Sequence, residues 1–600
     1  MGAESNWWVT ASFVTYMVGV FALGLAAHKL LSRGAFLGQY FLGGKNLGAW
    51  TLALTFASTS ASGGSFTGFP ALIYSQGWIM VLWIASYMMV PIVTMGVLGR
   101  RLNQLGHTIK ALTIPDVFRD RFQSDALGMV STLFIMSFLT FNLVGQFVAG
   151  GRIMSRVMGW ETTAYIEQAS VELRDEVIEL SQSETGTEIS ITLTARDAAG
   201  GDSVRTVTAT DVNELKSKDA RAYDLYREYG QENSWGYVAA VIIFSLVVVA
   251  YTAYGGFWAV VWTDVFQGIW MVVGVLIMLP VALYLVGGLG EATRTLAERD
   301  PGLVFGPGVN DFHPVGLMIS YFIMWSIVGM GQPASMWRLM AFKNTQVLRR
   351  SIFMVMVYYS AIYFPLVLIF ICARVILPPL GAPDDAMPSA AVTIGQQGLG
   401  HVAGSLLGGA IIAAPFAAIM STVDSFLLLI SSCLVRDLYQ RSFNPHVSEK
   451  AVKRMTYAVT AGVGILVCWI ALRPPAFLQY IIVFTGQGLA CCLLVPMVLA
   501  LFWRRSTAMG AMASMLAGFV VFISLYIVGW VGRGMEWLPP QTFGPRTALA
   551  PYWLGDLEPV VWGLAASVAA GIVVSLYTKP PDVAWLDRLF NAPANTTREA

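Results

Sequence analysis

Charged residues are scarce in this chain of 600 residues. Asp, Glu, Lys and Arg together make up 12% of the sequence, whereas hydrophobic residues make up 56%. A soluble globular protein carries roughly 25% charged residues, so water is not the solvent for most of this chain. Long apolar runs in place of charge indicate an all-α protein that crosses a lipid bilayer many times.

Several other features are also missing. The net charge is +1, so the chain lacks the basic excess that nucleic-acid binding requires. The five cysteines lie inside apolar segments without paired metal-ligand spacing, and we expect them to be buried thiols. None of the five histidines is spaced to pair with a serine or cysteine nucleophile. The sequence therefore argues against an enzyme. No basic segment precedes the first apolar run, as a cleaved signal peptide would require.

Apolar runs of about 20 residues, the length that crosses a bilayer core of about 30 Å, are repeated along the chain. We count thirteen predicted spans: 7–28, 49–70, 74–98, 127–150, 236–253, 257–286, 314–335, 351–375, 401–434, 455–472, 475–503, 507–531 and 558–578.

Lysines and arginines gather on alternate loops, at 29–45, 100–121, 343–350, 436–454 and 504–505. Positively charged loops face the cytoplasm. We therefore predict a multi-pass protein of the cell inner membrane, with its N-terminus outside and its C-terminus inside. Its expected partners are the lipid bilayer and a small-molecule solute, without nucleic acid, and the oligomeric state is left open.

A polar, acidic insert at 161–235 interrupts the apolar pattern. It contains an amphipathic stretch at 166–180, alternating β-branched residues within 189–209 around a Gly-Gly-Asp turn at 200–202, and a helical pattern at about 211–229. Alternation around such a turn predicts a β-hairpin. We expect a small extracytoplasmic α/β insert, which could be a cap over the entrance, a partner-binding module or a neutral insertion.

Two predicted spans are interrupted by small residues and glycine. The second contains Ala-Ser-Thr-Ser-Ala-Ser-Gly-Gly-Ser at 57–65, and the seventh contains Gly-Met-Gly-Gln-Pro at 329–333. Non-helical backbone at membrane depth is tolerated only where it lines a cavity or is buried in protein. Close helix crossing would explain either break alone. The pair, five spans apart, instead predicts a transporter core of two inverted five-helix repeats, spans 2–6 and 7–11.

Oxygen-bearing groups gather near the first break. Ala418, Ser421 and Thr422 are three and four residues apart in the ninth span, so they share one helical face. Ser58 and Ala61 lie one turn apart where the second span is expected to unwind. Two hydroxyls and several carbonyls of this kind are suitable ligands for a hard monovalent cation.

Two carboxylates also fall within apolar segments. Asp424 and Ser425 extend the ninth-span face, and Asp264 is expected near the cytoplasmic end of the sixth span. Intramembrane carboxylates are functional by default. The alternatives are a helix-capping role for Asp264 and a hydrogen-bonding role for Asp424. Arg338 is expected near the cytoplasmic end, which leaves no arginine at mid-membrane depth.

Five motifs together resemble the sodium:solute symporter family. They are Phe41-Leu-Gly-Gly-Lys-Asn-Leu-Gly48, the stretch 57–70, the stretch 251–267, Gly331-Gln-Pro333, and 413–425 followed by Arg436-Asp-Leu-Tyr439. The likeness covers roughly 8–150 and 236–505, and the insert departs from the family's short external loop. The resemblance implies an inverted-repeat core and the import of a small organic solute with sodium.

The resemblance also implies sodium ligands. One ion would be held by the carbonyls of Ser58, Ala61 and Ala418 and the hydroxyls of Ser421 and Thr422. A second cation, present in some members, would use the positions of Asp264, Asp424 and Ser425 and share Ser421. Those members have a small polar residue in place of Asp424, so the stoichiometry stays open between one and two sodium ions.

The solute branch is indicated by the same segments. The stretches around 57–68 and 413–422 are most similar to the pantothenate branch, and the proline branch has an aspartate where this chain has Ser60. The expected substrate-binding residues are Ser60, Gly63, Gln146, Trp325 and Gln332. We expect a carboxylate substrate to bind exposed backbone amides at the break formed by Gly63 and its neighbour.

Other classes stay open at this point. A proton-coupled transporter would use Asp264 or Asp424 as the proton carrier, and an amino-acid or sugar symporter would share the fold. The expected division of the chain is 1–48 (first helix and cytoplasmic loop), 49–160 and 236–313 (first repeat), 161–235 (insert), 314–505 (second repeat) and 506–600 (two further helices and a short tail).

Overall fold

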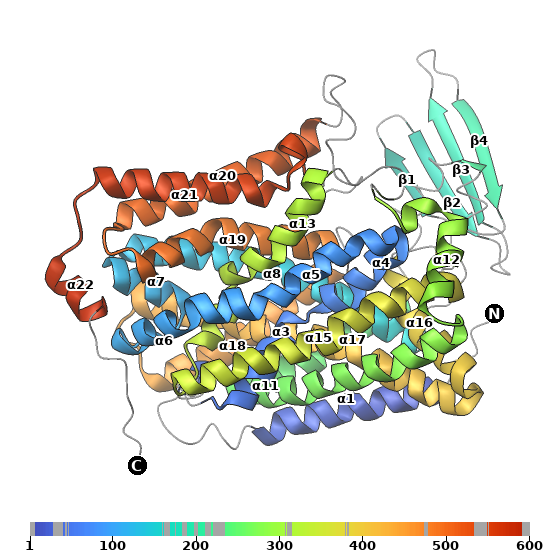
Figure 1. The fold of residues 1–600 in the computed structure, drawn as a ribbon, viewed down its shortest axis with the longest axis horizontal. Coiled ribbons are helices and arrows are strands. Elements are labelled where there is room, and N and C mark those ends of the chain that lie inside the picture. Colours follow the sequence, from blue (N-terminus) through green and yellow to red (C-terminus); the bar gives the residue numbers. More distant parts are fainter. Residues whose placement is uncertain are drawn as a thin grey trace.

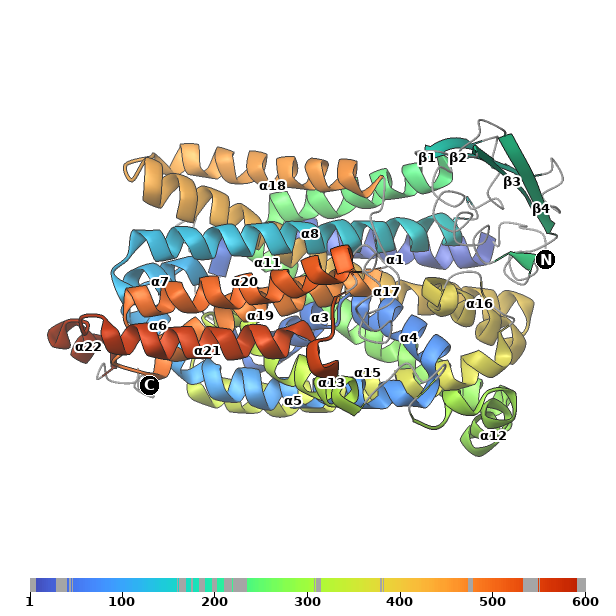
Figure 2. The ribbon, with the colours of Figure 1, turned by 90° about the horizontal axis from the view of Figure 1, so that it is seen from above.

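The structure is a computed structural model. It describes residues 7–27, 40–42, 45, 47–158, 160, 169–173, 176–182, 189–196, 202–209, 218–219, 235–306, 308, 315–377, 380, 383–472, 478–532, 549 and 551–590. Most of these residues form an elongated bundle of helices that run along its long axis (Figures 1 and 2).

The α-helices are α1 (Trp7–Ala27), α3 (Ala49–Ser60), α4 (Phe69–Gln76), α5 (Val81–Val90), α6 (Gly99–Thr108), α7 (Ile114–Phe122), α8 (Asp125–Val157), α11 (Trp235–Leu285), α12 (Leu289–Arg299), α13 (Val315–Val328), α14 (Pro333–Leu339), α15 (Thr345–Ile376), α16 (Ala386–Leu399), α17 (His401–Ser432), α18 (Glu449–Ala471), α19 (Leu478–Phe502), α20 (Ala508–Gly532), α21 (Pro559–Tyr577) and α22 (Val583–Phe590). Short π-helical or 3-10 turns join them at η3 (Gly64–Gly68), η4 (Gly77–Met80), η5 (Pro91–Leu98), η6 (Pro301–Leu303), η8 (Gly329–Gly331), η9 (Pro383–Asp385), η10 (Cys433–Phe443) and η12 (Leu554–Asp556).

The membrane spans follow from these lengths. Among the described residues, ten helices are long and apolar enough to cross a membrane, or eleven if Val315–Gly331 and Pro333–Leu339, bent by 52°, form one span. α11 alone covers two of the predicted spans. Its 51 residues would extend about 76 Å at 1.5 Å per residue, more than twice the thickness of the bilayer core. The count of thirteen stays a prediction.

The break within α11 is at Gly256. This residue has φ +59° and ψ −152°, outside the helical region, and an added Cβ would lie 2.5 Å from Cδ2 of Tyr40. A side chain would be strained there for both reasons. Glycine at this position therefore lets the chain turn between the two predicted spans.

The insert contains a four-stranded antiparallel sheet in the order β1-β2-β3-β4. The strands are β1 (Ala169–Leu173), β2 (Glu176–Gln182), β3 (Ile189–Arg196) and β4 (Asp202–Ala209). The predicted hairpin is confirmed as β3–β4, in which Ile189 pairs with Ala209 and Arg196 with Asp202. The amphipathic stretch at 166–180 contributes to β1 and β2. The helical pattern at 211–229 lies outside the described residues except for 218–219.

The first and last described helices place the chain ends. α1 begins at the end of the bundle that carries the sheet, and α22 lies at the opposite end (Figures 1 and 2). This arrangement agrees with termini on opposite sides of a membrane. Which side is cytoplasmic stays a prediction from the charged loops.

Candidate functional site

The second predicted span is broken where the sequence places its small residues. α3 ends at Ser60, the next residue has φ −79° and ψ 72°, and helical structure resumes as the π-helical turn η3. Serine hydroxyls compete with backbone amides for carbonyls, and Ser60 Oγ donates to Phe56 O at 2.8 Å. Two glycines, Gly63 and Gly64, follow three and four residues later and weaken the helix further.

The break leaves two backbone carbonyls of α3 without their usual helical donors. In a regular helix the N–H groups of Ser62 and Gly63 would bond to Ser58 O and Thr59 O. Here Ser62 N–H donates to Ser60 O at 3.0 Å instead, and Gly63 N–H donates to a side chain of α8. Buried carbonyls need another donor.

α17 supplies those donors. Ser421 Oγ donates to Ser58 O at 3.0 Å, and Thr422 Oγ1 donates to Thr59 O at 3.2 Å. Both hydroxyls also lie 3.0 Å from Ala418 O. All five residues are buried. Four of the five expected sodium-binding residues are therefore brought together, with Thr59 in addition.

The fifth expected ligand, Ala61, is the residue that follows α3. It is fully buried, and its N–H donates to Ala57 O at 2.9 Å. The hydroxyls of α17 contact the carbonyls of Ser58 and Thr59. The sequence reasoning missed Thr59. The two consecutive hydroxyls on α17 could have indicated it, because they face two consecutive carbonyls on α3.

The chemistry of this group suits a monovalent cation. Its oxygens are neutral carbonyls and hydroxyls, whereas Ca²⁺ and Mg²⁺ are usually held by carboxylates. Each hydroxyl can turn its proton away and offer a lone pair instead. The residues therefore fit a sodium ion between α3 and α17.

A buried ion pair lies about one helical turn away. Arg338 of α14 places Nη2 3.0 Å from Oδ2 of Asp264, and their side chains are 1% and 0% exposed. The same Nη2 is 2.6 Å from Ser425 Oγ, and Nε donates to Thr55 Oγ1 at 3.0 Å. Arg338 is the sixth of the seven residues of α14, which follows the break at η8, and it is buried within the protein. The expectation that no arginine lies at mid-membrane depth stays a prediction.

The other acid, Asp424, has its own partners. Tyr251 and Thr263 donate to its Oδ2 at 3.0 and 3.4 Å, and Ser425 Oγ lies 3.3 Å from Oδ1. The residue is fully buried. Nearby hydroxyls therefore hydrogen-bond to Asp424, as the alternative interpretation of this residue expected.

The amides at the break are already bonded. Gly63 N–H donates to Gln146 Oε1 at 3.1 Å, and Gly64 N–H donates to Ser62 Oγ at 3.2 Å. The expectation of exposed amides is therefore not met in this conformation. The amide oxygen of Gln146 occupies the position where a carboxylate oxygen would accept.

Two groups of expected substrate-binding residues meet at α19. Gln146 Nε2 donates to Asn142 Oδ1 at 3.2 Å, and Asn142 Nδ2 donates to Thr485 Oγ1 at 2.6 Å. The next residue, Gly486, accepts from Gln332 Nε2 at 3.0 Å and lies against the ring of Trp325. The sequence reasoning missed Asn142 and Thr485. Asn142 could have been found, because it is one turn from Gln146 on the same helical face.

The motifs, the broken helices and the oxygen cluster agree with a comparison of the sequence with models of protein families. The model of the sodium:solute symporter family matches residues 40–171 and 231–518. The chain belongs to this family. It is a sodium-coupled symporter, and the gap in the match falls within the predicted insert.

Individual sodium symporters are similar in sequence to this chain over most of its length. A sodium/pantothenate symporter of Haemophilus influenzae is 28% identical over 530 residues, covering 87% of this chain and 91% of its own. That of Escherichia coli is 27% identical, covering 86% and 90%. A sodium/proline symporter of Staphylococcus aureus is 23% identical, covering 99% and 98%.

A solved structure shares the fold. The substrate-bound, outward-open state of a Na⁺-coupled sialic acid symporter has a TM-score of 0.62 to this chain at 17% identity, and covers 96% of it and 99% of itself. The predicted class, an all-α membrane transporter with an inverted-repeat core, is confirmed.

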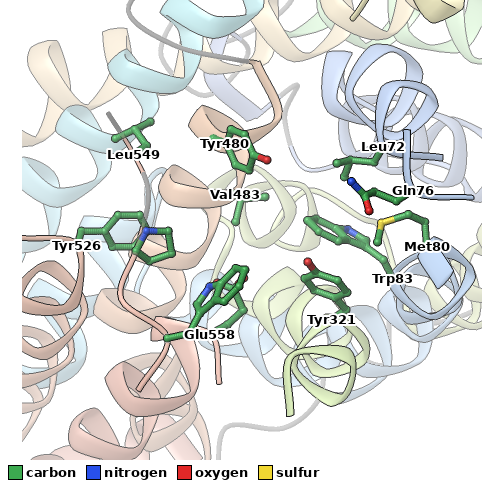
Figure 3. Close-up of a pocket in the computed structure, with 12 residues that line it drawn as sticks. Leu72, Gln76, Met80, Trp83, Tyr321, Tyr480, Val483, Tyr526, Leu549 and Glu558 are labelled. Carbon is green, nitrogen blue, oxygen red and sulfur yellow. The ribbon is translucent and has the colours of Figure 1, made fainter. Parts of the chain in front are cut away.

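A cavity with an empty volume of about 570 Å³ lies beside the aromatic side chains of the symporter. Figure 3 shows Trp83 and Tyr321 on one side of it and Tyr526 on the other. The rings of Trp83 and Tyr321 are 4.7 Å apart, and those of Tyr87 and Trp325 are 5.1 Å apart. These ring pairs extend from the cavity towards the expected substrate-binding residues.

A smaller cavity reaches the helix break from another direction. It has an empty volume of about 340 Å³ and is lined by Thr67 of η3, Arg152 and Arg156 of α8, and Asp384. Arg152 Nη1 lies 3.3 Å from Asp384 Oδ2. Arginine side chains line the smaller cavity, whereas Glu558 gives the larger one a carboxyl group.

Glu558, which directly precedes α21, yields a pH-dependent prediction. Burial raises its pKa from 4.5 to about 7, and the hydrogen bond from Gln487 Nε2 at 3.2 Å lowers it by less. The unfolded chain loses this proton near its ordinary pKa, whereas the folded protein keeps it to about pH 7. The contribution of Glu558 to the free energy of unfolding is therefore fully present below about pH 4.5 and decreases as pH rises from there to about 7.

We expect Glu558→Gln to remove this decrease. The melting temperature of the purified wild type should fall more between pH 5 and pH 8 than that of the variant. Glu298→Gln, at a side chain that is 69% exposed, should keep the wild-type profile. Equal slopes for wild type and Glu558→Gln would contradict the assignment.

Proposed function

We propose that this symporter imports a small monocarboxylate of the pantothenate type, together with sodium, across the cell inner membrane. The observation that carries the proposal is the pairing of two α17 hydroxyls with the two carbonyls left free by the break in α3. The sodium/pantothenate relatives, similar over most of the chain, favour that solute branch. Transport, rather than catalysis, is the role that these groups suit.

In the proposed sodium site, the ion replaces the hydroxyl protons that now face the carbonyls. Its ligands would be the carbonyls of Ser58, Ala61 and Ala418 and the hydroxyls of Ser421 and Thr422, with Thr59 O beside them. Because these oxygens come from two helices, the ion would hold α3 against α17. Its departure would let the two helices separate.

In the proposed solute site, a carboxylate oxygen takes the place of Gln146 Oε1 at Gly63 N–H. α8 carries Gln146 and also Arg152 and Arg156, which line the smaller cavity. Ser60, Trp325 and Gln332 would line the remainder of the site.

The proposed cycle couples the two sites. Sodium binds from outside and fixes the broken end of α3, which orders Gly63 for the solute. Coupling free energy is shared, so the solute also strengthens sodium binding. Release into the cytoplasm is favoured by low sodium there and by the membrane voltage, at about 2.3 kcal/mol per charge per 100 mV. The insert at 161–235 would form a separate extracytoplasmic module in this scheme.

The first test is uptake of labelled pantothenate into proteoliposomes. An inward sodium gradient should drive uptake, and potassium at equal ionic strength should not. Uptake driven by a pH gradient without sodium would indicate proton coupling instead. Sodium-driven uptake of proline or a sugar, but not of pantothenate, would contradict the solute assignment. The assignment of sodium as the coupling ion would then still hold.

Thr422→Ala tests the sodium site. Loss of one ligand should raise the sodium concentration for half-maximal uptake about tenfold, equivalent to about 1.4 kcal/mol, whereas one lost hydrogen bond costs the fold only about 1 kcal/mol. Thr422→Ser should restore sodium affinity. Ser432→Ala removes another buried α17 hydroxyl, which donates to Leu429 O at 2.7 Å, and should leave sodium affinity unchanged. Wild-type sodium affinity in Thr422→Ala would mean that the site is elsewhere.

Gly63→Ala tests the solute site. An added Cβ would lie 2.7 Å from Gln146 Oε1 and 2.9 Å from Cγ1 of Ile419, so it would displace the group that faces the solute. We expect the KM for pantothenate uptake to rise about tenfold or more, since about 1.4 kcal/mol of binding is a factor of ten. Gly96→Ala, where no heavy atom lies within 4 Å, is the matched control. Unchanged uptake by Gly63→Ala would exclude this amide as the carboxylate donor.

A further inference from the structure

The second-cation cluster, formed by Asp264, Asp424 and Ser425, already contains a positive charge. We propose that the guanidinium of Arg338 acts as a tethered cation in this cluster, so that the symporter carries one sodium ion per cycle. The inference rests on the proposed function and concerns its ion stoichiometry.

The guanidinium contacts the groups that a second ion would need. Nη2 lies 3.0 Å from Asp264 Oδ2 and 2.6 Å from Ser425 Oγ. Nε donates to Thr55 Oγ1 at 3.0 Å, and Nη1 donates to Ala334 O at 3.3 Å. An arginine side chain offers only donors and keeps its charge in proteins. It therefore uses these oxygens as a metal ion would, and a metal ion cannot share them at the same position.

The packing fixes the arginine in this position. Its side chain is 1% exposed, and the guanidinium itself donates through Nη1 to Ala334 O, one turn earlier in α14. Removing a guanidinium from such a site would leave the carboxylate buried and unpaired, which is strongly unfavourable. The charge of Arg338 therefore stays in the cluster while sodium binds and leaves.

The cluster already contains one balanced pair of charges. The proposed sodium site contains only neutral oxygens, and a buried cation needs a counter-charge nearby. The Asp264 carboxylate, which Thr59 links to that site, is already paired with Arg338. A second cation at this carboxylate would add a positive charge to a pair that is already balanced.

The two groups are connected directly. Thr59 Oγ1 lies 3.3 Å from Asp264 Oδ2, while its carbonyl accepts from Thr422. Ser425 Oγ donates to Ser421 O at 2.9 Å. The paired acid is thus one hydrogen bond from the sodium ligands.

Removal of Arg338 should open the second position. Within the described part of the chain, Asp264 Oδ1 is buried without a hydrogen-bond partner. Without the guanidinium, the carboxylate of Asp264 would lose its cation. Its two oxygens and Ser425 Oγ suit a second sodium ion.

The test is the number of sodium ions bound per protein, measured with radioactive sodium on the purified full chain, together with the charge moved per pantothenate. We expect one ion for wild type, two for Arg338→Met, and one again for the double variant Arg338→Met/Asp264→Asn. Arg338→Lys keeps the charge and should bind one. Two ions in wild type, or one in folded Arg338→Met, would overturn the proposal.

The controls separate this inference from loss of structure and from the proposed function. Arg121→Met removes another buried guanidinium, which bonds to Ala500 O at 3.0 Å, and should bind one ion. If Arg338→Met does not fold, wild type and Arg338→Lys still decide the stoichiometry. Two ions in wild type with sodium-driven uptake would reject only the tethered cation, whereas no sodium binding by wild type would reject the proposed function and with it this inference.

Discussion

The contact between α17 and the broken end of α3 is the interaction on which the account depends. Inside a bilayer, water cannot satisfy the carbonyls that a helix break leaves free. Ser421 and Thr422 satisfy two of them from another helix. Because the donors and acceptors belong to different helices, an ion that replaces the hydroxyl protons changes how strongly those helices are held together. In the proposed site, sodium binding and helix separation would thereby be linked at one point.

Buried charge is the second constraint. The carboxyl groups of Asp264 and Asp424 and the guanidinium of Arg338 are buried within the bundle. Charges at this depth persist only when they are paired, hydrogen-bonded or functional. Hydroxyls of α3, α11 and α17 form hydrogen bonds with these groups. The arrangement places the paired acid Asp264 one hydrogen bond, through Thr59, from the neutral oxygens of the proposed sodium site.

Sequence reasoning reached the parts that local pattern determines. The break in α3 follows from consecutive hydroxyl and glycine residues, and the shared face of Ser421 and Thr422 follows from helical spacing. It did not reach features that depend on which helices become neighbours. The pairing of Arg338 with Asp264 depends on the 52° bend that directs α14 after η8. The link between Gly63 and Gln146 joins residues 83 positions apart. Neither neighbour can be read from the local sequence.

The most direct measurement is a high-resolution structure of the protein determined in sodium and again with choline in its place. The account predicts density for one ion among the carbonyls of Ser58 and Ala418 and the hydroxyls of Ser421 and Thr422, present only in sodium. Arg338 should stay paired in both conditions. An ion found only beside the paired acid, or no ion between α3 and α17, would contradict the account.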